Sequence, residues 1–484
     1  MDVREVANHN SQESCWLILF DKVYDVTEFV SQHPGGPALI LKYAGADATK
    51  EYSNVHSPAV VEEHLPLAKC LGEVDAATKQ YLLVSQQRSP SVLPSETSRV
   101  PPLSLCVRLE DFEPVAKAVV TPQSYVYISS AADTLQSHRD NIAQWSKITF
   151  IPRVLRDVSR IDTSSSIFGQ RCSLPFFIAA TGMAGLTHPE GESPLAIGAA
   201  LSGIHYSPST YTSVPHEIIA TQHREAKQQH SDSCLIWQLY VNKSRDKTRE
   251  LIRKAKDLGF KGLFITVDTP VVGKRDEDKR LRAQEQLELG IVPEPVTYRG
   301  GEKIVPGSDN GAMCRSLNWE DVKYIREAWQ GPIALKGIQS AEDAKLAMDA
   351  GIEVIYLSNH GGRQLHSAPS ALATLLRIQA KYPEVLERCE IILDGGVTRG
   401  GDIVKALCLG AKAVGVGRPL LYAMGAYGLD GVMKAIDILR QEVEVTMTLL
   451  GATRLEELTP SLVNVRNLAR EIDGLEDSGV SSRL

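Results

Sequence analysis

The sequence has no long hydrophobic run, because none of its apolar stretches approaches the roughly 20 residues that a membrane-spanning helix needs. We also expect no N-terminal export or mitochondrial presequence, since Met1–Glu5 leads straight into folded-looking sequence. Basic residues are not in excess, with 52 Lys and Arg against 59 Asp and Glu, which argues against nucleic-acid binding. We therefore expect an intracellular protein that binds neither membranes nor nucleic acids.

Closely spaced cysteines are also missing. The eight cysteines are scattered, with no CxxC pair, so we expect reduced core thiols rather than a disulfide framework. With 484 residues, 43% of them hydrophobic and 23% charged, the chain is typical of a globular protein of two or three domains.

Most of the chain predicts a repeated strand and helix pattern. Ser340–Ala350 is the clearest helix, with Ser340 as cap, Asp343 completing a capping box and Gly351 ending it. Eight units of this sort favour a (β/α)8 TIM barrel. The eight short β-rich runs are 175–181, 204–210, 234–240, 262–268, 331–337, 354–360, 390–396 and 413–419. The interval 269–330 is too long for one unit, and we interpret it as an insertion that could cover the barrel rim.

Polar residues crowd the C-terminal ends of these runs, which is the rim where barrel enzymes place their active sites. Structural polar residues would instead be spread over both ends of the strands. The pattern therefore predicts an enzyme. The rim residues are Thr181, Ser209, Gln238, Tyr240, Thr266, Asp268, Lys336, His360, Asp394 and Arg418.

One rim segment, Ser358–Leu365, combines a titratable His360 with the planar Arg363. A neutral imidazole accepts a proton near pH 7, and a guanidinium binds a carboxylate with two hydrogen bonds. The segment predicts a base and an anion clamp on one loop, although a solvated surface turn has the same composition. Gly-rich turns at Asp394–Val397 and Gly415–Pro419 follow the seventh and eighth runs, where barrels commonly bind a phosphate, so we expect a phosphorylated cofactor.

Residues 1–75 form a separate predicted unit, followed by a Pro- and Ser-rich linker at 76–105, a barrel at 106–470 and a tail at 471–484. We expect a strand at Val23–Thr27, a short helix at Glu28–Val30 and a turn at His33–Gly36. Together with Cys15-Trp16, Ala44-Gly45 and His56-Ser57-Pro58, these motifs resemble a small α+β cytochrome b5-like haem domain. The resemblance implies that His33 and His56 ligate the iron of a heme b that carries single electrons.

Residues from about 107 to 465 resemble the FMN-dependent α-hydroxy-acid dehydrogenase and oxidase family, through Ser358–Leu365, Leu393–Val397, Thr266–Asp268 and Gln238–Tyr240. The resemblance implies that His360 is the base and that Asp268 stabilises its imidazolium. It also implies that Arg363 and Tyr127 hold the substrate carboxylate, that Tyr240 bonds its hydroxyl, and that Arg275 adds positive charge. The implied FMN-binding residues are Lys336, Thr181, Gly182, Ser209, Gln238, Thr266, Asp394, Gly396, Arg399, Gly417 and Arg418.

The sequence departs from that family at several positions. Gly182 stands where lactate and glycolate enzymes usually have Ala, and Tyr211 where a Leu or Trp shapes the substrate side, so we expect an acid bulkier than lactate. Thr398 replaces an Arg, which removes one expected phosphate contact unless Arg399 or Arg418 compensates. His366 and Ala131 also differ, and we assign no effect to either.

We expect oxidation of an (S)-2-hydroxy acid to the 2-oxo acid on FMN, with electrons leaving through the haem. Residues 1–75 hold five Lys and Arg against twelve Asp and Glu, which would suit a basic, cytochrome c-like acceptor or simply keep the domain soluble. A second possibility is an oxidase that ends on O2, and a third is a haem carrier with an inactive barrel. Ser482-Arg483-Leu484 resembles a peroxisomal address, so we expect a cytoplasmic or peroxisomal location, and the family resemblance suggests a homotetramer.

Overall fold

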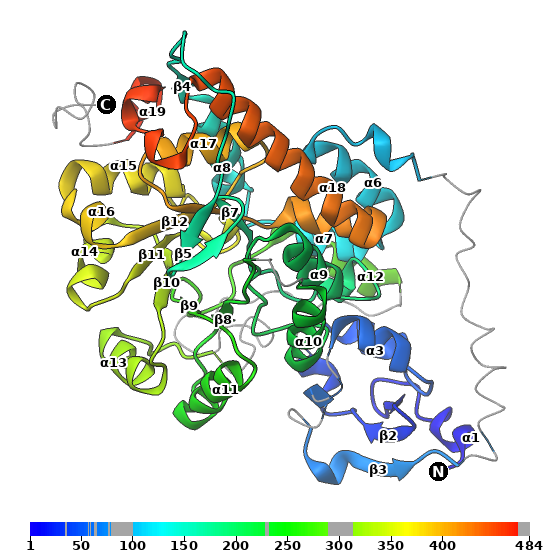
Figure 1. The fold of residues 1–484 in the computed structure, drawn as a ribbon. Coiled ribbons are helices and arrows are strands. Elements are labelled where there is room, and N and C mark those ends of the chain that lie inside the picture. The colour runs from blue at the N-terminus through cyan, green and yellow to red at the C-terminus, as the bar shows by residue number, and fades with distance from the viewer. Residues whose placement is uncertain are drawn as a thin grey trace. The chain divides into compact units, whose positions relative to one another are not determined.

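Two compact units make up the chain: Met1–Val100 with Glu277–Gly311, and Pro101–Asp276 with Ala312–Leu484 (Figure 1). The predicted linker and tail fall largely outside the described residues. None of the helices in the described ranges is both long and apolar enough to cross a bilayer. The computed structural model describes residues 1–33, 36–56, 58, 60–61, 65–75, 78, 100–227, 232–288 and 313–472.

The first unit contains a three-stranded antiparallel sheet in the order β1-β2-β3. Its helices are short, and Val26, Val30 and Ile40 are among the buried side chains of its core. The predicted α+β class is confirmed, but the helix expected at Glu28–Val30 is wrong, because a turn there leads into the 3-10 helix η1 at Val30–Gln32. The other elements are α1 Val3–Val6, β1 Trp16–Leu19, β2 Lys22–Asp25, α2 Pro37–Leu41, α3 Thr49–Val55, η2 Leu67–Lys69 and β3 Cys70–Glu73.

The second unit is built on a parallel sheet in the order β7-β13-β12-β11-β10-β9-β8. Seven of the eight predicted runs form these strands. Their bounds are β7 Phe176–Ile178, β8 Trp237–Leu239, β9 Leu263–Thr266, β10 Ile333–Ile338, β11 Val354–Leu357, β12 Glu390–Asp394 and β13 Ala413–Val416.

The second run, 204–210, is not an extended strand, and it contributes only isolated bridges centred on Tyr206. Tyr206 pairs in parallel with Ile178 on one side and with Leu235 on the other. The Ile236 N–H donates to the Tyr206 carbonyl at 3.0 Å, and the Tyr206 N–H donates to the Cys234 carbonyl at 3.1 Å. Tyr206 therefore fills the eighth position and closes the predicted (β/α)8 barrel.

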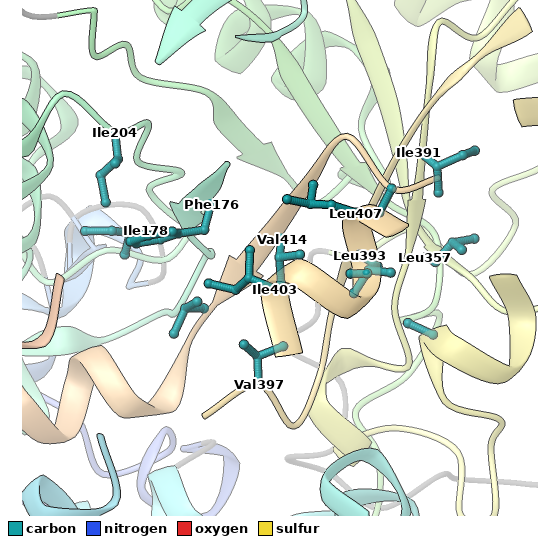
Figure 2. Packing of buried hydrophobic residues seen from close by; sticks show 14 of the residues in the cluster. Phe176, Ile178, Ile204, Leu357, Ile391, Leu393, Val397, Ile403, Leu407 and Val414 are labelled. Atoms are coloured by element: carbon teal, nitrogen blue, oxygen red, sulfur yellow. The ribbon is translucent and has the colours of Figure 1, made fainter. Parts of the chain in front are cut away.

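Alternate residues of the strands face two different apolar layers, which explains why the strands are continuous apolar runs. Phe177, Phe264 and Tyr356 belong to the cluster inside the barrel. Ile178, Leu393 and Val414, from β7, β12 and β13, belong to the outer cluster, where Ile403 and Leu407 of α17 join them (Figure 2). The inner layer fills the barrel, so the polar chemistry is confined to its rim.

Helices cover the outside of the barrel (Figure 1). Ser340 caps α14 (Ala341–Asp349) by accepting from the Asp343 N–H at 3.0 Å, as predicted. The capping box is not formed, because the Asp343 carboxylate accepts from the Ser340 hydroxyl instead. The remaining helices are α6 Phe112–Val119, α7 Pro122–Ser129, α8 Gln136–Ser146, α9 Ser193–Ser202, α10 His216–Ala226, α11 Arg245–Asp257, α13 Trp319–Ala328, α15 Ala371–Lys381, α16 Glu384–Arg388, α17 Gly400–Cys408, α18 Arg418–Leu450 and α19 Arg466–Ala469.

Short elements complete the second unit. A hairpin of β5 and β6 precedes the first barrel strand, and β4 pairs with β14. In the interval predicted to be an insertion, α12 (Asp276–Glu288) falls almost entirely within the first unit, whereas α13 belongs to the second unit and leads into β10; residues 289–312 lie outside the described ranges. The short elements are β4 Thr149–Phe150, β5 Ser165–Ile167, β6 Gln170–Cys172, β14 Val463–Asn464, and the 3-10 helices η5 Leu103–Leu105, η6 Leu109–Asp111, η7 Ala184–Leu186, η8 His360–Gly362, η9 Leu455–Glu457 and η10 Pro460–Leu462.

All eight cysteines are free thiols, as the sequence predicts. Six of them are fully or largely buried, including Cys172, Cys234 and Cys408. Burial raises the pKa of each of these three thiols to about 12, so they are protonated at neutral pH and contribute to packing.

Candidate active site

His360 and Asp268 meet at the barrel rim, after β11 and β9 respectively. The Asp268 carboxylate lies 2.9 Å from Nδ1 of His360, which leaves Nε2 facing the Tyr240 hydroxyl at 3.3 Å. The Asp268 side chain is 1% exposed, whereas His360 keeps 22% of its side-chain surface exposed. A carboxylate that orients an imidazole whose second nitrogen is accessible is the arrangement of a general base.

Burial and charge set the protonation states of this pair. Burial lowers the pKa of His360, the Asp268 charge opposes that shift, and the nearby Lys336 charge reinforces it, so the imidazole is neutral at neutral pH. Burial works to raise the pKa of Asp268, but the His360 and Lys336 charges and the hydrogen bonds from His360 and Thr269 outweigh it and lower the pKa. A neutral imidazole beside an ionised carboxylate is ready to accept a proton.

We predict that Asp268→Asn reduces kcat/KM by about 100- to 1,000-fold, because the imidazolium formed during the reaction loses its compensating charge. The Asp268 charge raises the pKa of His360, so its removal moves the acid limb of the pH profile to lower pH. The measurement is kcat/KM against pH for both proteins. A limb that moves to higher pH would contradict the assigned coupling.

The loop that presents His360 depends on residues with positive φ. His360, Gly361 and Gly362 have φ of +60°, +64° and +78°, and a Cβ at position 362 would lie 2.6 Å from the His138 backbone nitrogen. Asn359 stabilises the turn because its side chain accepts from the Gly362 N–H at 3.0 Å. The glycines of Ser358–Leu365 are thus required by geometry, which places the base at a strained position.

The Asn359 amide also forms a reciprocal pair with Asn141 of α8, at 2.8 and 2.9 Å. Gln364 also fixes the loop, because its side chain donates to the backbone carbonyls of Asp268 and Val271 at 3.0 and 2.9 Å. The loop that carries His360 is therefore held to Asp268 in two ways: the two side chains contact each other, and Gln364 of the same loop bonds to the Asp268 backbone.

A buried polar network lies beneath His360. The Ser358 hydroxyl donates to Asp394 at 2.6 Å and accepts from the His360 N–H at 3.0 Å. The ammonium group of Lys336, a residue that is 3% exposed, lies 3.4 Å from the same hydroxyl and 4.0 Å from Asp394. Tyr356 donates to the other Asp394 oxygen at 2.8 Å. The network therefore holds the Lys336 ammonium group at the rim, and its nearest carboxylate, that of Asp394, is not in close contact with it.

Arginines surround Tyr127 of α7. The guanidinium carbons of Arg275 and Arg363 each lie 5.2 Å from the centre of the Tyr127 ring. Nη1 of Arg363 donates to the carbonyls of Tyr127, Ile128 and Ser130 at 2.8 to 3.1 Å, so this nitrogen is engaged by the chain itself. Nη1 of Arg275 is buried and has no hydrogen-bond partner among the described groups. The structure thus brings Arg275, Arg363 and Tyr127 together, and Arg275 has a donor without a partner among the described groups.

Three predicted flavin-facing residues, from three neighbouring barrel positions, are hydrogen-bonded to one another. The Gln238 amide accepts from the Ser209 hydroxyl at 3.0 Å and donates to the Thr266 hydroxyl at 2.7 Å. The Thr181 hydroxyl is buried without a partner among the described groups. An isoalloxazine ring has a polar edge that needs hydrogen-bond partners. The Thr181 hydroxyl, which has no partner in the described part of the chain, and the Gln238 amide, together with the ammonium group of Lys336, could supply them, so these residues suit FMN.

The predicted phosphate-binding arginines have other partners. Arg399 pairs with Glu110 and Glu442 at 3.1 and 3.5 Å. The Arg418 guanidinium donates to the carbonyls of Ile128, Ser130 and Gly361 and contacts His138. Gly417 is the N-cap of the long helix α18, and Gly396 has φ of +71°. Backbone N–H groups at this helix start and at the Gly396 turn therefore suit the phosphate.

His33 and His56 approach each other in the first unit, with ring centres 6.2 Å apart and planes at 74°. An imidazole nitrogen binds a transition metal at about 2 Å, so two rings on opposite sides of one iron have centres about 6 Å apart. Nδ1 of His33 lies 3.2 Å from the Gly36 carbonyl, which leaves Nε2 as the nitrogen that would bind the iron. Burial lowers the pKa of His33 and keeps it a neutral ligand. The pair fits a haem iron.

Taken together, a barrel with a base and an anion clamp at its rim, and a separate bis-histidine domain, define a flavin- and haem-dependent oxidoreductase. Residues 116–465 match the family described as FMN-dependent dehydrogenase, and residues 2–75 match the cytochrome b5-like heme/steroid binding domain. The chain belongs to the FMN-dependent dehydrogenase family, and its cofactors are FMN and heme b.

The chain is 38% identical to the L-lactate dehydrogenase (cytochrome) of Wickerhamomyces anomalus, over 96% of this chain and 79% of that protein. Among solved structures, a flavocytochrome b2 double mutant with pyruvate bound superposes with a TM-score of 0.69 and 35% identity, covering 80% of this chain and 93% of the other. A mandelate oxidase variant reaches a TM-score of 0.62 at 32% identity, covering 74% and 98%.

Several residues of the site were not predicted from sequence. These residues support the site through hydrogen bonds to other site residues, such as the 2.9 Å bond from the Thr269 hydroxyl to Asp268. They are Asn141, Tyr356, Gln364 and Thr269. Tyr356 lies inside a predicted strand, where an aromatic side chain indicates core packing. Gln364 and Thr269 each lie next to a predicted site residue, and that adjacency was the one available signal.

Proposed function

We propose that this enzyme oxidises an (S)-2-hydroxy acid to the 2-oxo acid and passes the electrons through its haem to a one-electron acceptor. The observation that carries the proposal is the His360–Asp268 pair, with Nε2 of His360 facing Tyr240 beside the arginines around Tyr127. A 2-hydroxy acid carries a hydroxyl and a carboxylate on adjacent carbons. The base can take a proton from the hydroxyl-bearing end while the neighbouring arginines bind the carboxylate. When bound, FMN would supply a two-electron acceptor for the substrate, and the haem would supply a one-electron carrier.

The residues divide the work as follows. Arg275 and Arg363 attract the substrate carboxylate, and Tyr127 lies between their guanidinium groups. Tyr240 bonds the substrate hydroxyl. His360 takes a proton at Nε2, from Cα or from the hydroxyl, while Asp268 stabilises the imidazolium through Nδ1. Lys336 adds a fixed positive charge where the flavin gains negative charge.

A second candidate is an oxidase that returns electrons to O2. The similarity to a mandelate oxidase and the C-terminal Ser482-Arg483-Leu484 favour it. The test is steady-state turnover of a panel of (S)-2-hydroxy acids, with cytochrome c reduction and peroxide formation measured side by side. Rapid cytochrome c reduction with little peroxide supports the haem route, and the reverse result supports the oxidase. No turnover of any acid would contradict both.

The substrate side chain is proposed to be larger than that of lactate. A Cβ at Gly182 would lie 3.0 Å from the Tyr211 carbonyl and 3.4 Å from the Ser209 hydroxyl, so glycine lets the loop after β7 approach Tyr211 without a methyl group between them. The Tyr211 ring stacks on Tyr240 at 5.5 Å between centres and offers an aromatic wall beside the hydroxyl-binding group. Both features suit an aromatic or long-chain acid.

We predict that Gly182→Ala lowers kcat/KM for a bulky acid such as mandelate by about 10-fold or more relative to lactate, since one methyl in a pocket discriminates by such factors. Comparison of the two acids in both proteins measures the effect. An equal loss for lactate and mandelate would show that position 182 does not face the substrate side chain.

Partners and location are also proposals. The acidic first domain suits a basic protein acceptor, and a homotetramer is expected from the family resemblance. The Ser482-Arg483-Leu484 tripeptide lies outside the described residues. A fluorescent fusion with and without this tripeptide tests peroxisomal import: loss of punctate signal on its removal supports it, and an unchanged diffuse signal supports the cytoplasm.

A further inference from the structure

Glu192 is a charged side chain in the barrel unit that the chemistry described above does not use. It precedes α9 and is 0% exposed. None of the ion pairs among the described residues includes it. A carboxylate removed from water without a cationic partner is costly unless several hydrogen bonds satisfy it, so its retention needs an explanation.

The Glu192 carboxylate is satisfied entirely by backbone N–H groups of two rim loops. One oxygen accepts from the Ala184 and Ser213 N–H groups, each at 3.0 Å. The other accepts from the Ser213 and Val214 N–H groups, also at 3.0 Å. Burial raises the pKa of Glu192, and these N–H groups oppose that shift. Ala184 lies in the loop after β7, and Ser213 and Val214 lie in the loop after the Tyr206 position.

Helix capping does not account for this arrangement. A residue before a helix usually accepts from the second or third N–H of its own helix. Glu192 occupies the N-cap position of α9 but makes no such bond, because both oxygens point to the loops. Gly191 allows this path, since its φ is +54° and a Cβ there would lie 2.7 Å from Val214.

The two loops carry two predicted flavin-facing residues and the two residues proposed to shape the substrate side of the site. The first loop holds Thr181 and Gly182, and the second holds Ser209 and Tyr211. They are joined by the bond from the Met183 N–H to the Tyr211 carbonyl at 2.9 Å, the same carbonyl that faces Gly182. A further bond runs from the Gly185 N–H to the Ser213 hydroxyl at 2.9 Å.

We propose that Glu192 is a positioning residue that fixes the gap between Gly182 and Tyr211 and thereby sets which acid side chains the enzyme accepts. The inference rests on the proposed 2-hydroxy-acid oxidation. A neutral amide has only one acceptor oxygen, so the Ser213 and Val214 N–H groups would face an NH2 group instead of an acceptor, and the aromatic wall, which stacks on Tyr240, shifts relative to the glycine. Discrimination between acids then falls more than the rate of the chemical step.

The test is Glu192→Gln, which keeps the size of the side chain and removes its charge. We measure kcat/KM for lactate and mandelate, together with FMN content. The ratio of kcat/KM for the two acids should change by about 5- to 10-fold in the direction of one, because a loosened pocket discriminates less between side chains. Glu190→Gln is the matched control, because Glu190 lies two residues away with 65% of its side chain exposed, and it should leave the ratio unchanged.

If Glu192→Gln does not yield folded protein, Ser213→Ala serves instead, because it removes the hydroxyl that accepts from Gly185 and should move the ratio in the same direction. Equal losses for both acids, with an unchanged ratio in the folded variants, would overturn the positioning role and leave a merely structural one. The unmodified enzyme separates the two proposals: if no 2-hydroxy acid reduces its flavin, the proposed function itself fails.

Discussion

Replacing His360 with glutamine is expected to slow flavin reduction by the hydroxy acid about 1,000- to 10,000-fold, because the site loses its proton acceptor. Glutamine keeps a polar group of similar length, so FMN binding and folding should persist. The base faces Tyr240 at 3.3 Å and Asp268 at 2.9 Å, and no other imidazole shares this pair of contacts among the described residues. Anaerobic rapid mixing with substrate measures the flavin bleaching rate directly.

His366→Gln is the matched control for this experiment. His366 lies six residues further along the chain, and its Nδ1 is buried without a partner among the described groups. It should reduce flavin at close to the unmodified rate. Normal bleaching in His360→Gln would refute the assignment of the base, whatever the effect on the control.

The second large effect is expected in the haem domain. His56→Ala should abolish the six-coordinate haem spectrum and cytochrome c reduction, because His33 alone would supply only one protein ligand to the iron. Flavin reduction by the acid should continue, since the barrel has its own hydrophobic core and all of its site residues lie in the second unit. Absorption spectra of the reduced and oxidised protein give the readout.

His9→Ala provides the comparison in the same domain. His9 stacks on Trp16 with ring centres 3.5 Å apart and bonds to Ser14, so it is engaged elsewhere. It should retain the haem spectrum. A six-coordinate spectrum that survives in His56→Ala would rule out His56 as a ligand.

The rim residues could be predicted because parallel strands in a barrel have the same direction. Once eight apolar runs were recognised, polar residues at their C-terminal ends had to meet, and His360, Asp268 and Lys336 do so. The second run failed as a regular strand because Tyr206 alone makes the pairings to both neighbours. A short apolar run looks the same in sequence whether it forms a ladder or a single bridge.

The supporting contacts could not be predicted, because they join residues far apart in the chain. Asn141 and Asn359 are 218 positions apart, and Arg418 and His138 are 280 apart. Nor could the sequence predict the partners of the arginines near the Gly-rich turns: Arg418 bonds to backbone carbonyls and Arg399 to carboxylates. The type of a side chain shows which hydrogen bonds and ion pairs it can form, and only the fold determines which groups it forms them with.

The most direct measurement is an anaerobic visible spectrum of the pure protein before and after addition of (S)-2-hydroxy acids, including lactate and mandelate. Flavin bleaching followed by the growth of sharp reduced-haem bands is the result we expect, because the barrel oxidises the acid and the His33–His56 haem receives the electrons. A protein that contains haem but shows no flavin bleaching with any acid, even after FMN addition, would contradict 2-hydroxy-acid oxidation by this chain.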